Sequence, residues 1–129
     1  MDEVLAKAEE WRAGGEDVAL ATVVGTRRSA PRPLGSKLAI TSDGRMFGSV
    51  SGGCVEADVC ERAKVVLSDA TPELVTYGIA DDEAWSVGLP CGGEIDVFVE
   101  EADPELVARI RSLLAADERA VLVLSLIHI

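Results

Sequence analysis

The stretch DVALATVVG, residues 17–25, decides the fold. It is a continuous run of small and β-branched apolar residues, which is typical of a buried strand. Before it, apolar residues at helical spacing between Val4 and Trp11, followed by Gly14 and Gly15, predict a short leading helix. After it, residues 37–42 and 45–50 flank the turn sequence SDG and predict a β-hairpin.

The remainder of the chain alternates between helical and strand patterns. Residues 55–67 place apolar side chains on one helical face and charges on the other, and residues 104–116 are helical in pattern with Asp103 as N-cap. Residues 74–79, 94–100 and 120–124 read as strands, the second by its alternation. These patterns predict a single domain of the α/β class, with α+β as the other option, built on a mixed sheet with flanking helices.

Composition and charge limit the classes of function. A chain of 129 residues has room for one hydrophobic core, and no segment approaches the roughly 20 apolar residues of a membrane span. The formal charge of -11 argues against nucleic acid as a partner. An odd set of cysteines, Cys54, Cys60 and Cys91, without a signal segment favours a cytoplasmic protein with reduced thiols.

A basic segment interrupts this acidic chain. Residues 26–42 contain Arg27, Arg28, Arg32 and Lys37 and no acidic residue. This local excess of positive charge favours a small anionic ligand over a polymer. The alternative is a solvated loop whose charges are balanced by acidic neighbours in space.

The stretch GSVSGGCVEA, residues 48–57, places glycines and a thiol where a helix is expected to begin. We expect Ser51 to be the N-cap and Gly52 and Gly53 to lie in the first turn, where unpaired N–H groups are open to an anion. Cys54 would share that turn and have a lowered pKa. The alternative is that Cys54 is a small buried hydrophobe and that the glycines serve only a tight turn.

A second stretch, GLPCGGEIDV at residues 88–97, has a similar pattern, with Cys91 before Gly92 and Gly93. Brought together, the two loops would surround a ligand with backbone amides and two thiols. Cys60 is expected to be structural. No Cys-x-x-Cys pair supports a classical metal site, and no phosphate-loop or dinucleotide-binding pattern occurs.

Two blocks of the sequence resemble a known family. The run GTRRSAPRPLGSKLAITSDGRMFGSVSGGCVEADV, residues 25–59, and the run VGLPCGGEIDVFVE, residues 87–100, are similar to the N-terminal domain of the xanthine dehydrogenase accessory factor family, XdhC/CoxI. Cys54 points to the CoxI-like branch, because the XdhC branch usually has a GGxLE form without cysteine. The family's SxPRxxG motif is present from Ser29 to Gly35, although Lys37 and Leu38 replace the more usual Arg-Met.

The resemblance implies a maturation factor, more an accessory chaperone than an enzyme. Family members are thought to bind the molybdenum cofactor, protect it, support its sulfuration and deliver it to apoenzymes such as xanthine dehydrogenase or carbon monoxide dehydrogenase. Whether the molybdopterin is in its mononucleotide or dinucleotide form stays open, as do a sulfurtransferase partner and a homodimer. The residues expected to bind the cofactor are Arg27, Arg28, Ser29, Pro31, Arg32, Gly35, Ser49, Ser51, Gly52, Gly53, Cys54, Glu56, Cys91, Gly92 and Gly93.

Two other functions remain alternatives. The first is a thiol-dependent sulfurtransferase or redox protein in which Cys54 is the nucleophile and Cys91 the resolving thiol. The second is a scaffold that docks a client enzyme through its acidic surface, with the glycine loops acting only as turns.

The last residues, LSLIHI at 124–129, read as a translated transposon-end adapter from a sequencing library. We therefore expect the family domain to occupy residues 1–123 and the natural chain to continue differently, with a Rossmann-like domain as one continuation. On this interpretation His128, the single histidine, carries no function.

Overall fold

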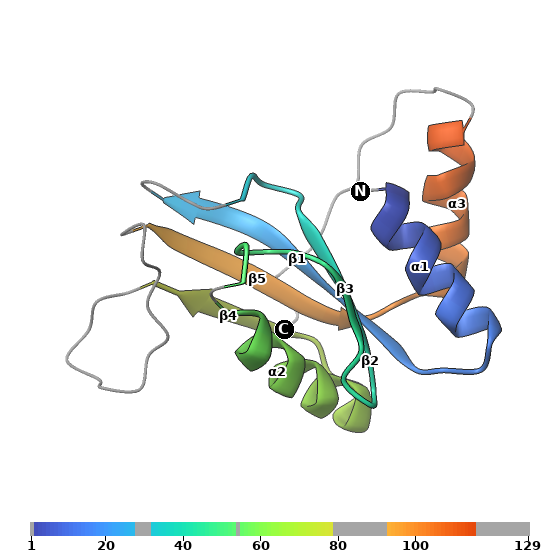
Figure 1. Ribbon diagram of the computed structural model, residues 1–129, viewed down its shortest axis with the longest axis horizontal. Coiled ribbons are helices and arrows are strands. Elements are labelled where there is room, and N and C mark those ends of the chain that lie inside the picture. The colour runs from blue at the N-terminus through green and yellow to red at the C-terminus, as the bar shows by residue number, and fades with distance from the viewer. Residues whose placement is uncertain (1, 28–31, 54, 79–92, 116–129) are drawn as a thin grey trace.

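The computed structural model describes residues 2–27, 32–53, 55–78 and 93–115 of the chain. Five strands form one sheet in the order β3-β2-β1-β5-β4, so that β1 is the central strand. Figure 1 shows this twisted sheet with helices on its two faces. The strands are β1 (Val18–Arg27), β2 (Lys37–Thr41), β3 (Met46–Gly48), β4 (Glu73–Tyr77) and β5 (Glu94–Glu101).

Three helices cover the sheet. Helix α2 (Glu56–Asp69) packs on one face, while α1 (Asp2–Ala13) and α3 (Pro104–Ala115) lie side by side against one end of the other face (Figure 1). Asp103 caps α3 as predicted, because its carboxylate accepts the backbone N–H of Glu105 at 3.0 Å. The described residues thus form two hydrophobic clusters, one on each side of the sheet.

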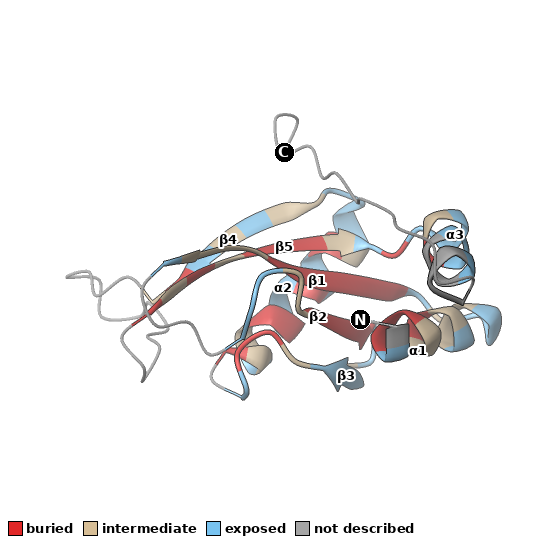
Figure 2. Cartoon of the chain, turned by 90° about the horizontal axis from the view of Figure 1, so that it is seen from above, coloured by how far each residue is buried: buried red, intermediate tan, exposed pale blue. Residues whose placement is uncertain are grey.

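Strand β1 separates the two clusters. Ala19, Ala21 and Val23 point into the cluster under α2, and Val18 and Leu20 point into the cluster under α1. All five side chains are buried, and Figure 2 shows β1 as a largely buried ribbon at the centre of the molecule. The continuous apolar run of residues 17–25 is therefore explained by a strand that is covered on both faces.

The predicted sheet with flanking helices in a single domain is confirmed, and so is the hairpin of β2 and β3. One detail is corrected: every strand pair in the described residues is antiparallel, whereas we expected a mixed sheet. Parallel neighbours need a crossover connection, usually a helix. Helix α2 instead joins β3 and β4, which lie on opposite edges of the sheet and do not pair. The arrangement is therefore α+β rather than α/β. The strand expected at residues 120–124 lies outside the described residues.

No helix in the described parts of the chain is long and apolar enough to cross a membrane.

Gly48, the last residue of β3, brings the hairpin close to α1. Its φ is +104°, a conformation that L side chains rarely adopt. A Cβ atom added at Gly48 would collide with the carbonyl oxygen of Lys37 and lie 2.8 Å from a methyl group of Val4. The absence of a side chain at Gly48 therefore allows α1 to pack against the hairpin.

We predict that Gly48→Ala lowers the free energy of unfolding by about 3 kcal/mol, since it adds a backbone clash to the cost of a positive φ. Gly15→Ala is the matched control, because Gly15 also has a positive φ, +87°, but has open space around an added Cβ. The control should lose only about 1 kcal/mol. Urea unfolding followed by circular dichroism measures both values, and equal losses would contradict the close packing at Gly48.

Candidate functional site

The glycine loop, residues 49–53, connects β3 to the turn before α2 and is organised by one carboxylate. Glu56, the first residue of α2, folds back over the loop, and its two oxygens accept hydrogen bonds from two hydroxyls and four backbone amides. These come from the hydroxyls of Ser49 (2.8 Å) and Ser51 and from the N–H groups of Val50 (3.0 Å), Ser51 (3.0 Å), Gly53 (3.0 Å) and Val55 (3.3 Å). The loop is thus shaped around a negative charge from its own chain.

This geometry corrects the expected helix start. Helix α2 begins at Glu56, and its N-cap is Val55, which makes no side-chain capping bond. Ser51 is not the N-cap, and Gly52 and Gly53 precede the helix with φ of +73° and +109°. The amide of Gly52 donates to the Ser49 hydroxyl at 2.7 Å. The loop amides that we expected to face a bound anion are therefore bonded to Glu56 or Ser49.

The hydrogen bonds also determine the charge state of Glu56. Burial by itself would raise the pKa of this carboxyl group, but the bonds from Ser51, Ser49 and the backbone outweigh burial and lower the pKa to about 2. Glu56 therefore stays ionised at any physiological pH. A permanently charged acceptor keeps the glycine loop in one shape, and open space surrounds the positions where Gly52 and Gly53 would carry a Cβ.

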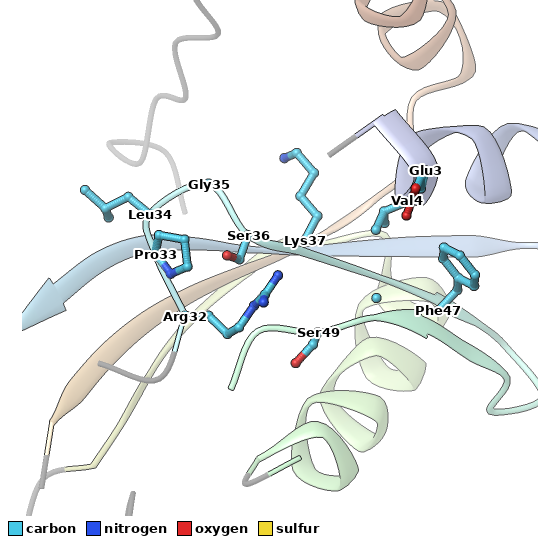
Figure 3. A pocket seen from close by; sticks show the side chains of 11 residues that line it. Glu3, Val4, Arg32, Pro33, Leu34, Gly35, Ser36, Lys37, Phe47 and Ser49 are labelled. Atoms are coloured by element: carbon cyan, nitrogen blue, oxygen red, sulfur yellow. The ribbon is translucent and has the colours of Figure 1, made fainter. Parts of the chain in front are cut away.

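An open pocket of about 510 Å³ lies beside the glycine loop (Figure 3). Three of its lining residues, Arg32, Gly35 and Ser49, belong to the set predicted to bind the cofactor. Ser49 lines the pocket and is also bonded to Glu56, so the pocket and the loop share one side chain. The other lining residues are Glu3, Val4, Pro33, Leu34, Ser36, Lys37, Phe47 and Gly48.

The two described arginines of the predicted set have different surroundings. Arg27 ends β1 and donates to Glu94 (2.8 Å) and to both oxygens of Asp96 (2.9 and 3.0 Å). The bonds to Asp96 and then to Glu94 raise the pKa of Arg27, and the bond from Arg27 lowers the pKa of Asp96. Arg32 has no carboxylate within salt-bridge distance among the described residues. Among the described residues, the balanced-charge alternative thus holds for Arg27, whose two acidic neighbours are Glu94 and Asp96.

The end of β4 and the start of β5 lie in close contact, at Gly78 and Gly93. Gly78 has a φ of +94°, and a Cβ added there would collide with the carbonyl oxygen of Gly93. Tyr77 donates to Asp58 of α2 at 2.6 Å. Burial first, and then this bond, raise the pKa of Tyr77. The end of β4 is thus bonded to Asp58 in the first turn of α2, two residues after Glu56 and close to the glycine loop.

Several predicted site residues lie outside the described residues, namely Arg28, Ser29, Pro31, Cys54, Cys91 and Gly92. Cys60 is buried in the cluster under α2, as expected for a structural residue. Within the described ranges no group of three His, Cys, Asp or Glu side chains could hold a metal ion.

Sequence reasoning missed two features of the site. The cofactor role of Glu56 stays a prediction, but the binding of its carboxylate to the glycine loop was not foreseen. A signal was available, since an acid three residues after Gly53 can reach back to that residue's amide, as in a capping box. Sequence reasoning also missed Phe47, which lines the pocket and is 37% exposed. Nothing in the local pattern marks Phe47, because its role depends on the packing of β3 beside α1.

We predict that Glu56→Gln destabilises the protein at neutral pH, by about 2 kcal/mol, because the amide cannot accept all the bonds of the carboxylate. Since the folded pKa lies below the unfolded one, the wild-type contribution is present above about pH 4.5 and is lost as pH falls towards about 2. The stability difference between the variant and the wild type should therefore shrink over this interval in urea titrations. A difference that is constant with pH would contradict an ionised role.

Chemical rescue provides a second test of the same contacts. In Glu56→Ala the loop donors lose their acceptor, so formate at tens of millimolar should raise the melting temperature of this variant but not of the wild type. Chloride at the same ionic strength is the control. Equal effects of the two salts would show that the loop does not select a carboxylate.

Comparisons with known proteins agree with this structure. The model of the XdhC and CoxI family matches residues 11–78, which is more than half of the chain. A probable xanthine dehydrogenase subunit of Bacillus subtilis is 37% identical over 92 residues, covering 70% of this chain and 28% of that protein. The molybdenum cofactor insertion chaperone PaoD of Escherichia coli is 38% identical over 99 residues, covering 76% of this chain and 30% of PaoD.

A solved structure has the same fold. The crystal structure of a xanthine dehydrogenase from Bacillus halodurans superposes with a TM-score of 0.68 at 27% identity, over 87% of this chain and 34% of that one. The chain therefore spans about a third or less of the length of these relatives. On the family match, together with the fold and the two sequence blocks, the chain belongs to the XdhC and CoxI family.

Proposed function

We propose that this chain is the cofactor-handling domain of a maturation factor that binds the molybdenum cofactor and passes it to a molybdenum hydroxylase. Family membership and the likeness to a molybdenum cofactor insertion chaperone support the role. The observation that carries it is the open pocket beside the glycine loop, which three residues of the predicted set line. We also place the function in the cytoplasm, where thiols stay reduced.

The chemistry of the described residues fits the cofactor. Molybdopterin carries a phosphate, or a pyrophosphate in its dinucleotide form, and Arg32 offers a guanidinium with no described carboxylate beside it. Cys54 follows the glycine loop, and Cys91 lies in the segment that begins at Gly78 and ends at Gly93. The bond between Tyr77 and Asp58 holds the end of β4 against the first turn of α2, which follows the glycine loop. Soft sulfur ligands there would suit a molybdenum centre.

To test the role, the full chain is produced in a host that makes molybdopterin, and the purified protein is assayed for molybdenum and for pterin. We expect Cys54→Ser and Cys91→Ser to lower cofactor occupancy by about tenfold, which corresponds to ~1.4 kcal/mol of lost binding. Cys60→Ala is the control, since this thiol is buried under α2 and donates to the carbonyl of Gly44 at 4.0 Å.

Two results would contradict the proposal. A wild-type protein that carries no pterin would reject the cofactor role. Unchanged occupancy in both serine variants, with normal activation of the client enzyme, would reject the role of the thiols. A Cys54 that is alkylated rapidly below pH 7 in a protein without cofactor would instead favour the thiol-dependent enzyme.

A further inference from the structure

The side chain of Arg27 connects the ends of three strands. Arg27 is the last residue of β1, and its Nε donates to a carboxylate oxygen of Glu94 at 2.8 Å. Its two Nη atoms donate to the two carboxylate oxygens of Asp96 at 2.9 and 3.0 Å. Asp96 also accepts the hydroxyl of Thr76, on β4, at 2.7 Å. One network thus spans β1, β5 and β4 at the end of the sheet where these strands lie side by side (Figure 1).

The backbone of β1 is shaped for this network. The register shift after Val23 moves Gly25 and Arg27 to the face opposite the cluster under α2, and bulges commonly re-aim side chains in this way. Gly25 then lies directly across from Asp96, and a Cβ atom added there would collide with the Asp96 carboxylate. Because residue 25 has no side chain, this carboxylate can lie over β1 and meet the guanidinium two residues further along.

The charges of the network do not favour an external anion at Arg27. Glu94 and Asp96 together carry more negative charge than the single guanidinium neutralises. A phosphate at Arg27 would have to displace a carboxylate that the chain itself holds in place, and it would be repelled by both acids. The bonds of Arg27 to Asp96 are also two parallel bonds of the fork type, which fix geometry as well as charge. This arrangement suits a residue that holds the strands rather than a direct ligand.

We propose that Arg27 is a positioning residue of the cofactor-handling domain, which together with Asp96 fixes the spacing of β1, β4 and β5 at this end of the sheet. Groups that act together on one ligand have to be held to within about 0.5 Å. The predicted cofactor residues that adjoin these strand ends in sequence are Arg28, Ser29, Pro31, Cys91, Gly92 and Gly93. The inference rests on the proposed function, because the residues so positioned are those assigned to the cofactor.

The substitution Asp96→Asn separates positioning from direct binding by the sign of its effect. It leaves the guanidinium of Arg27 in place and removes one of the two charges that neutralise it. If Arg27 were a ligand of the cofactor, the freed guanidinium would bind the anion more tightly. If Arg27 is a positioning residue, the loss of its fixed partner weakens binding instead.

The first measurement is cofactor occupancy in the full chain, produced in a host that makes molybdopterin and assayed for pterin. We expect Asp96→Asn to lower occupancy about fivefold, the upper end of the contribution of an exposed ion pair. Glu73→Gln is the matched control. It removes a carboxylate that pairs with the exposed Arg62 at 2.9 Å, but at the other end of β4, and should leave occupancy unchanged.

The second measurement is amide hydrogen exchange in the protein without cofactor. In Asp96→Asn the amides of residues 25–27 and 94–96 should exchange about fivefold faster, because the strand ends open locally more often. The amides of residues 19–21, at the centre of the sheet, should keep their wild-type rates. A residue that only stabilised the whole sheet would raise all of these rates together, so this comparison isolates a local role.

The outcomes separate the inference from the proposed function. Unchanged or higher occupancy in Asp96→Asn, beside a wild type that carries pterin, would overturn the positioning role and keep the maturation role. Lower occupancy with faster exchange throughout the sheet would also overturn positioning, since Asp96 would then serve overall stability. A wild type without pterin would reject the maturation role. Faster exchange confined to residues 25–27 and 94–96 would then still support Arg27 as the residue that fixes the strand ends, and uniform or unchanged exchange would overturn it.

Discussion

Burial of β1 on both of its faces is the constraint on which the rest of the molecule depends. The strand gives Ala19 and Ala21 to one hydrophobic cluster and Val18 and Leu20 to the other. At Val23 the same strand holds the pocket wall, and a bulge between Val23 and Gly25 then shifts the register. After the bulge, Arg27 lies on the same face as Glu94 and Asp96 and pairs with both.

The glycine loop shows how an internal ligand can take the place of an external one. A helix start with glycines and free amides attracts anions, and the sequence supports that expectation. In this chain the anion is the carboxylate of Glu56, which accepts the loop amides. Because it is attached a few residues away, it is present at a very high effective concentration. The loop therefore keeps one shape without an external ligand, and Arg32 lies in the adjoining pocket.

The local patterns of the sequence predicted most of the elements. The apolar run at 17–25, the alternation in β5 and the Asp103 cap each depend on neighbours within a few residues. The antiparallel pairing was not predictable in this way, because β1 meets β5 about 70 residues further along the chain, and nothing local records that partner. The same limit applies to the site: the different fates of Arg27 and Arg32 are decided by acids that lie distant in sequence, Glu94 and Asp96.

The contact between Gly78 and Gly93 has a consequence for how such domains diversify. Where the two ends of a segment already touch, its closure entropy changes only slowly with length, so residues can be inserted, deleted or exchanged between them at little cost to the sheet. The junction of Gly78 and Gly93 is therefore a place where the chain tolerates changes in length. A change in the length of the chain between Gly78 and Gly93 should therefore leave the pairing of β4 with β5 unchanged.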